Sequence, residues 1–275
     1  MDAYRVAYDG TNYRGFQRQP DVPTVEDALL DACAALDLGR PPPGYAAAGR
    51  TDTGVSALAQ TVGFEAPTWC RPRALNAELP ADVRAWARAE APAEYHATHD
   101  ATGRTYEYAL CVPDLDRDRL RAALTALAGT HDLTALTPDR TGTERTLRTD
   151  LRWPDGTAVC RVTAGGFPRR LVRRAMGLVT AVATGERPVA DIARLLADGP
   201  AAPDHERPAA APPEPLVLVD VTYPALTFTP DPVAVEDTRE VFEARRRRLT
   251  ARTRVAERIA TGVGTATDGD MADDG

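Results

Sequence analysis

The sequence predicts a mixed α+β fold, because strand and helix patterns alternate over about the first ninety residues. Residues 4–8 carry large apolar side chains with a period of two, as in a half-buried strand. Residues 24–38 carry apolar side chains at helical spacing, after a threonine and an acid placed to cap a helix. A strand over residues 61–65, a helical segment and a strand over residues 84–88 complete a small α+β sandwich.

A second unit begins near residue 95. Tyr106, Tyr108, Leu110 and Val112 recur with a period of two, which predicts that they share one face of a strand. Leucines at helical spacing predict an amphipathic helix over residues 117–128. The further elements expected are strands near 146–153 and 157–163, a helix with Pro168 in its first turn, a helix over 189–197, a loop over 199–215 and a central apolar strand over 216–221.

The chain ends in an Arg-rich segment. Residues 240–259 are expected to form a helix that carries Arg245 to Arg248 and further arginines against few acids. Such a charge run fits a solvated helix and an RNA-binding arm equally well. From Thr261 the sequence is rich in Gly and Asp, and we expect it to be disordered.

The composition is that of a soluble globular protein of one large or two modest domains. The 275 residues are 43% hydrophobic and 27% charged. Apolar runs are too short to span a bilayer, and the first residues do not resemble a signal peptide. The four cysteines are widely spaced, which favours isolated core thiols in a reducing cytoplasm and argues against a metal site.

The charge pattern is unusual. All 33 basic residues are arginine, against 40 acids, for a net charge of −7. This balance argues on its face against a nucleic-acid partner, whose phosphates attract cations. An acidic chain without lysine also fits adaptation to high salt, or a GC-rich genome that favours arginine codons. The arginines cluster in the sequence, so the local charge can differ from the net charge.

The stretch with the strongest chemical signal is a short turn around Asp52. Arg50 precedes this carboxylate, and Gly49 and Gly54 enclose the pair. Two glycines so close together let the backbone approach a ligand. Spacing alone also fits an ordinary surface turn, because Gly and Asp are common in turns.

The wider string of residues 49–60 resembles the active-site signature of the TruA family of tRNA pseudouridine synthases, G-R-T-D-A-G-V-H-A-x-G-Q. Here Thr53, Ser56 and Ala59 replace the usual Ala, His and Gly. These departures flank the Arg-Thr-Asp core, so they concern the detail of the loop more than its chemistry.

Four further segments resemble the same family in the expected order, so that the resemblance runs from about Tyr4 to Tyr223. Residues 8–17 resemble Y-D-G-T-x-Y-x-G-W-Q, with Phe16 in place of Trp. One interpretation of this segment is a hairpin turn with a buried aromatic side chain. The other is a loop in which Arg14 and Gln17 face the substrate. The other segments are residues 75–83 (L-N-x-x-L-P-x-D-I), 95–108 (F-H-A-R-x-x-A-x-x-R-x-Y-x-Y) and 165–173, which places Arg173 at the arginine of x-x-F-x-x-x-M-V-R.

The resemblance implies the pseudouridine synthase fold, with two ferredoxin-like halves whose antiparallel sheets meet at a central cleft. We expect an N-terminal α+β half over residues 1–98 that carries the Asp52 loop, and a C-terminal α+β half over residues 99–230. Residues 231–275 would form the Arg-rich helical arm and disordered tail.

The resemblance also implies roles in the conversion of uridine to pseudouridine. Asp52 is the catalytic carboxylate, which either attacks ribose C1′ or removes the proton at C2′. Arg173 pairs with Asp52, and Arg50 fills the space that an everted base leaves. Tyr106 stacks on the uracil, although on the residues alone it fits a core aromatic, and Leu216 packs beneath the ring.

The family's substrate is a uridine in the anticodon stem-loop of tRNA, around positions 38 to 40, and the family acts as a homodimer. It uses no metal ion or other cofactor. Two other interpretations fit parts of the sequence. Asp52-Thr53-Gly54 also matches the D-T-G of aspartic proteases, but a second such motif is lacking and a cation adjoins the acid. A non-catalytic RNA-binding protein of the same fold would keep the arginines without needing Asp52.

Overall fold

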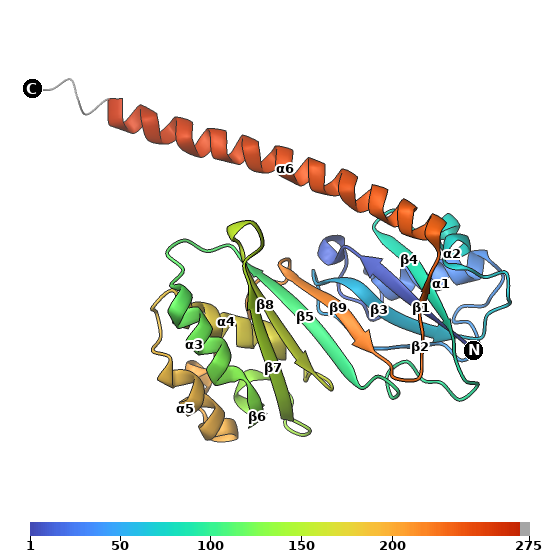
Figure 1. The fold of residues 1–275 in the computed structure, drawn as a ribbon, viewed down its shortest axis with the longest axis horizontal. Coiled ribbons are helices and arrows are strands. Elements are labelled where there is room, and N and C mark those ends of the chain that lie inside the picture. The colour runs from blue at the N-terminus through green and yellow to red at the C-terminus, as the bar shows by residue number, and fades with distance from the viewer. Residues whose placement is uncertain (270–275) are drawn as a thin grey trace, which may run out of the picture.

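The computed structural model describes residues 1–269 and is built on one sheet of ten strands (Figure 1). Neighbouring strands are antiparallel except for β3 and β9, which pair in parallel. The path runs β10 (Thr229–Pro230), β4 (Val83–Glu90), β1 (Asp2–Tyr8), β3 (Ser56–Phe64), β9 (Leu216–Thr222), β5 (Gly103–Leu110), β8 (Ala158–Ala164), β7 (Glu144–Arg152) and β6 (Gly129–Asp132), with β2 (Ala46–Ala47) paired to β3. The mixed α+β class is therefore confirmed, and two antiparallel groups of strands meet at the β3–β9 pair.

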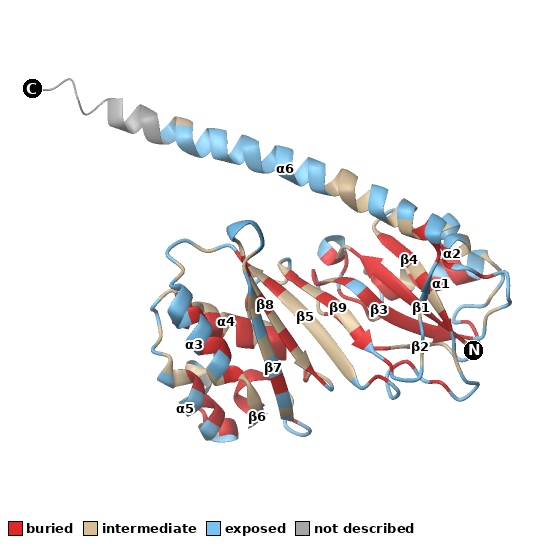
Figure 2. Cartoon of the chain, in the orientation of Figure 1, coloured by how far each residue is buried: buried red, intermediate tan, exposed pale blue. Residues whose placement is uncertain are grey.

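The helices pack into two separate apolar cores. Helices α1 (Val25–Ala35) and α2 (Pro72–Glu78) cover the strands of the first half. Helices α3 (Arg117–Leu127), α4 (Leu171–Ala183) and α5 (Ala190–Asp198) cover those of the second half. Figure 2 shows buried segments on both groups of strands, in contrast to the exposed length of α6 (Pro232–Gly269).

Strand β9 joins the two cores. Its Leu216 belongs to the core of the second half, whereas Leu218 and Val221 belong to the core of the first. The continuous apolar pattern predicted a central strand, and this prediction is confirmed.

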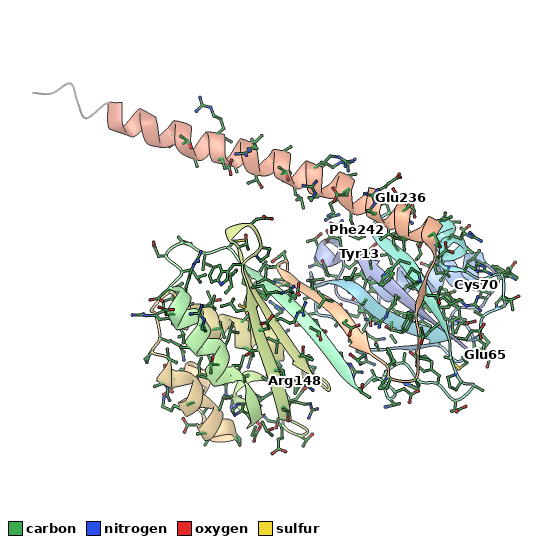
Figure 3. All side chains as sticks on the ribbon, viewed as in Figure 1. Tyr13, Glu65, Cys70, Arg148, Glu236 and Phe242 are labelled. Carbon is green, nitrogen blue, oxygen red and sulfur yellow. The ribbon has the colours of Figure 1, made fainter. Side chains whose placement is uncertain are left out.

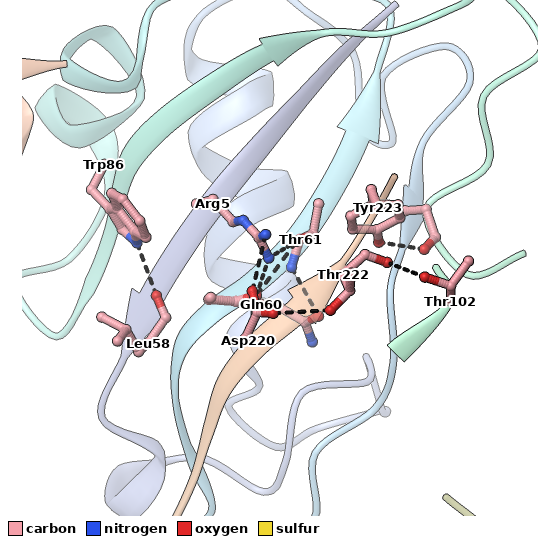
Figure 4. A network of polar contacts seen from close by, with 11 residues as sticks. Arg5, Leu58, Gln60, Thr61, Trp86, Thr102, Asp220, Thr222 and Tyr223 are labelled. Atoms are coloured by element: carbon pink, nitrogen blue, oxygen red, sulfur yellow. Dashed lines mark hydrogen bonds and ion pairs between the residues drawn. The ribbon is translucent and has the colours of Figure 1, made fainter. Parts of the chain in front are cut away.

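A buried arginine also bridges the junction. Arg5 on β1 donates to the Ala59 carbonyl (3.2 Å) and to Thr61 Oγ1 (3.1 Å) on β3, and it pairs with Asp220 Oδ1 on β9 at 3.2 Å (Figure 4). Burial lowers the pKa of Arg5, and the nearby Asp220 carboxylate opposes that shift. One side chain thus ties a strand of the first half to the strand that closes the second.

Helix α1 begins as the sequence predicts. Thr24 Oγ1 accepts from the Asp27 amide (3.2 Å) and donates to Asp27 Oδ2 (2.7 Å), so the first turn is capped. The helix ends at Ala35, three residues earlier than Leu38, because Asp37 takes a left-handed backbone with φ of 58°.

Several expected boundaries are wrong. Pro168 lies outside α4, because Arg170 takes a left-handed backbone (φ 59°) and the helix starts at Leu171. Strand β5 ends at Leu110, so Val112 lies beyond it.

Cys111 is exposed, whereas the other three cysteines are buried thiols.

The C-terminal tail also differs from expectation. Residues 261–269, expected to be disordered, continue α6 as a helix, and the rest of the expected tail (270–275) lies outside the described residues. Within the part of the chain that is described, no helix combines the length and apolar character needed to cross a membrane.

Candidate active site

A pocket of about 830 Å³ opens where the two halves meet. The Asp52 loop, β5, β9 and the start of α4 all contribute to its wall. The pocket brings together all five side chains that the resemblance singles out, which come from four distant parts of the sequence: Arg50, Asp52, Tyr106, Arg173 and Leu216.

The backbone on either side of Asp52 is held by hydrogen bonds. Thr51 Oγ1 lies 2.8 Å from the buried Tyr8 hydroxyl, and the Thr51 carbonyl accepts from the Phe16 amide at 3.1 Å. Gln60 Nε2 donates to the Gly49 carbonyl at 2.8 Å. The Asp52 side chain itself is 30% exposed, so a fixed loop presents it to the pocket.

Two glycines let this loop pack closely. Gly54 takes a φ of 80°, which favours glycine, and its amide donates to the Tyr13 carbonyl at 3.3 Å. A Cβ on Gly10 would lie 2.1 Å from the Val55 carbonyl oxygen. Any larger residue at position 10 would therefore push the Asp52 loop away from its support.

Arg173 faces Asp52 across the pocket. Its Nη1 lies 3.5 Å from Asp52 Oδ2, and the two side chains are 18% and 30% exposed. Its Nε donates to the Ala211 carbonyl at 2.9 Å, and the Ala211 amide returns a bond to the Arg173 carbonyl at 2.9 Å. The guanidinium is thus held by the segment before β9 while it points at the carboxylate.

Tyr106 lies on β5 beside the same carboxylate. Its ring packs edge-on against Phe167, with centroids 5.3 Å apart and an interplanar angle of 82°. Burial raises the pKa of Tyr106, the Asp52 carboxylate raises it further, and Arg104 opposes the shift. The hydroxyl is therefore protonated near neutral pH. Leu216, 3% exposed, lies opposite Tyr108 in the β5–β9 register.

Arg50 differs from the other four side chains. It is exposed at the edge of the pocket, and within the described part of the chain it has no hydrogen bond or ion pair. Such a side chain can change its position without breaking a hydrogen bond or an ion pair.

The sequence interpretation gave no role to several residues that line the pocket. Arg104 donates to four carbonyls, those of Ala48, Thr98, Ala101 and Gly165, at 2.6 to 3.1 Å, and so joins loops of both halves. Arg104 lies in the segment 95–108 that resembles the family, so this resemblance could have singled it out as a site residue. Phe167, another residue of the wall, is the Phe of the family-like segment 165–173, which was a signal of the same kind. The wall also includes Arg145, Arg169, Arg170 and Leu218, to which the sequence analysis gave no place in the site.

The pocket is locally basic in an acidic chain. Its wall includes six arginines, at positions 50, 104, 145, 169, 170 and 173, against the acids Glu26 and Asp52. This local excess of positive charge suits a polyanionic ligand despite the net charge of −7. Gln17 also lines the wall, whereas Arg14 does not.

His96 lies at the pocket wall beside His99, with ring centroids 4.2 Å apart. Its Nδ1 accepts from the Thr98 amide at 3.2 Å. No group of three metal-ligating side chains occurs among the residues that the structure describes.

Comparison with known proteins identifies the family. A sequence profile described as tRNA pseudouridine synthase matches residues 123–224. The chain is 55% identical to tRNA pseudouridine synthase A of Natronomonas pharaonis over 262 residues, which cover 93% of this chain and 97% of that protein. It is 52% identical to the protein of the same name from Haloarcula marismortui over 279 residues, covering 96% and 100%. The chain therefore belongs to the tRNA pseudouridine synthases, the isomerases that convert uridine to pseudouridine in tRNA.

Proposed function

We propose that Asp52 is the catalytic residue and that the modified uridine lies in the anticodon stem-loop, around positions 38 to 40. The observation that carries this proposal is a partly exposed carboxylate in a basic pocket, facing a fixed guanidinium at 3.5 Å. A pocket of about 830 Å³ can hold an everted nucleotide.

The reaction breaks the bond between C1′ and N1, turns the uracil, and joins C1′ to C5. The proton on C5 is lost and N1 gains a proton, so the overall change is an isomerisation. Asp52 begins this sequence in one of two ways: it attacks C1′ to form an ester, or it removes the C2′ proton to form a glycal. Both routes need a carboxylate at the ribose.

The other pocket side chains position the nucleotide. Tyr106 stacks on the uracil, and Leu216 packs beneath it. Arg50 enters the space that the everted base leaves in the stem-loop, because its planar guanidinium stacks well and has no hydrogen bond or ion pair within the described chain. Arg173 holds the Asp52 carboxylate, which its contact with Ala211 supports.

The test is replacement of Asp52 by Asn, which keeps the shape and removes the charge, and by Ala. We expect tritium release from 5-tritiated uridine in tRNA to fall below detection for both variants. Binding of tRNA should stay near that of the wild type, because the arginines of the pocket remain. If Asp52→Asn still turns over, Asp52 is not the catalytic residue. If the wild type binds tRNA without releasing tritium, the protein is a non-catalytic binder.

We further propose that two copies form a homodimer in the cytoplasm, where one subunit grips the tRNA body while the other modifies it. Within each chain, residues 1–98 and 99–230 are the two halves, and residues 231–275 are an appended arm. Two apolar cores support this division, with strand β9 contributing side chains to both. Sedimentation of the protein with and without tRNA measures the subunit count.

A further inference from the structure

Helix α6 reverses its charge along its length. Residues 232–244 hold four acids and one arginine, and this part packs on β4 and α2, where Asp237 pairs with Arg84 at 3.4 Å. Residues 245–258 hold seven arginines and one glutamate. Figure 3 places Glu236 and Phe242 on the part of the helix near the body, and Figure 2 shows the later turns exposed. The basic segment therefore begins where the helix leaves the body.

Arg245 fixes the start of this basic segment beside the Asp52 loop. It pairs with Asp9 and donates to Thr11 Oγ1 at 2.8 Å. These residues belong to the turn around η1 (Gly10–Asn12), and the Gly10 amide donates to Ser56 Oγ at 3.1 Å, just after the Asp52 loop. A short chain of direct contacts thus connects the arm to the catalytic loop.

Two arginines continue the face of the helix that Arg245 occupies. Arg248 and Arg252 follow it by three and seven residues, which places all three on one side of the helix. Both are exposed and have no ion-pair partner among the described residues. Arg246 and Arg254, which point to other sides, pair with Glu243 (2.9 Å) and Glu257 (3.0 Å) on the helix itself.

We propose that Arg248 and Arg252 bind the phosphate backbone of the tRNA outside the pocket, on the side of α6 that Arg245 anchors. The segment from residue 245 to residue 258 spans about 20 Å of helix, enough to follow the backbone past the stem-loop. The turn that Arg245 contacts is hydrogen-bonded to Ser56 beside the Asp52 loop, so this side of the helix starts close to where the uridine would bind. The inference rests on the proposed function of the pocket and extends it to a second contact with the same substrate.

The rival occupant is a second copy of the chain. Leu249, Val255, Ile259 and Val263 are exposed on α6 and could pack against a partner helix. The arginines interleaved with these apolar residues favour RNA, because phosphate contacts are the principal source of affinity for nucleic acid.

The experiment compares two double variants of equal charge change in the full-length protein. Arg248→Gln with Arg252→Gln removes the proposed contacts. Arg246→Gln with Arg254→Gln is the matched control on the same helix. Both are made on the Asp52→Asn background, and tRNA affinity is measured by filter binding over a range of salt. Binding then does not depend on turnover. An error in the assignment of Asp52 as the catalytic residue and an error in the assignment of Arg248 and Arg252 as RNA contacts therefore give different results.

We expect the first pair to weaken tRNA binding about ten-fold and to lower the slope of log K against log salt by about 1 to 2. The control pair should change affinity less than about two-fold. With Asp52 intact, the first pair should raise KM for tRNA and leave kcat unchanged. Equal losses in both pairs, or a change in sedimentation to a smaller oligomer without loss of tRNA affinity, would overturn the proposal. Circular dichroism of each variant checks that α6 remains helical.

Discussion

At the scale of single residues, the Arg173 guanidinium makes two contacts at the same time. Its Nη1 faces Asp52 at 3.5 Å, and its Nε donates to the Ala211 carbonyl at 2.9 Å. A lysine could supply the charge but not two donors in a fixed planar arrangement. The family resemblance singled out Arg173, whereas its contact with Ala211 depends on residues 38 positions apart coming together in the fold.

The protonation state of Tyr106 leads to a pH prediction. Burial and the Asp52 carboxylate raise the pKa of Tyr106 above the usual value of about 10, so the phenol stays neutral as the pH rises to that value. We expect kcat to show no tyrosine ionisation up to about pH 10, and Tyr106→Phe to have the same profile shape over that range. Single-turnover tritium release from pH 6 to pH 10 is the measurement. An alkaline limb between pH 8 and pH 10 that disappears in Tyr106→Phe would contradict this assignment.

At the scale of elements, the position of helix α4 depends on a close contact with the segment that precedes β9. A Cβ on Gly177 would lie 2.1 Å from the Ala209 carbonyl oxygen. That segment also contains Ala211, whose carbonyl accepts from Arg173. Gly177 therefore lets the helix and the loop approach closely enough to orient the guanidinium.

We predict that Gly177→Ala destabilises the protein by about 1–3 kcal/mol, because the added methyl group must displace backbone. The melting temperature should fall, and kcat should fall about ten-fold as Ala211 moves away from Arg173. Gly262→Ala is the matched control, since a Cβ there would meet only the end of the Arg258 side chain. Calorimetry and tritium release on both variants provide the comparison. If Gly177→Ala keeps the wild-type melting temperature and turnover, the segment before β9 can accommodate the methyl group, and the prediction is wrong.

At the scale of the whole molecule, the net charge is negative, whereas the local charge in the pocket and on part of α6 is positive. The chain carries −7 overall, yet six arginines line the pocket and seven occupy residues 245–258. Acidic residues elsewhere supply the balance. The inference that net charge argues against RNA binding therefore fails, because affinity depends on the charge that faces the ligand.

The acidic surface predicts a requirement for salt. With 40 acids and no lysine, like charges repel at low ionic strength, where the screening length grows to about 30 Å at 0.01 M. We expect dialysis into dilute buffer to reduce activity and ellipticity at 222 nm, and potassium chloride to restore both. Full activity in dilute buffer would contradict the hypothesis.

The sequence by itself determined the features that depend on near neighbours. The cap at Thr24 and the apolar run of β9 each depend on a few consecutive residues, so periodicity and residue type predicted them. The Asp52 motif is also local, but spacing alone fitted a surface turn as well, and the family resemblance singled it out. The ends of elements were less predictable. The left-handed backbone of Arg170 puts Pro168 before α4, and α6 continues through residues 261–269 despite their glycines.

The tertiary structure alone decided which further side chains share the pocket with the five that the resemblance singles out. Arg145 and Leu218 join Asp52 there because β9 pairs with β3 on one side and with β5 on the other, where the register shifts once between Thr105 and Tyr106. A shift of one residue would turn Leu218 and Tyr106 to the opposite face of the sheet. That register is set by the packing of two cores built from residues far apart in the chain, and no local pattern contains this information.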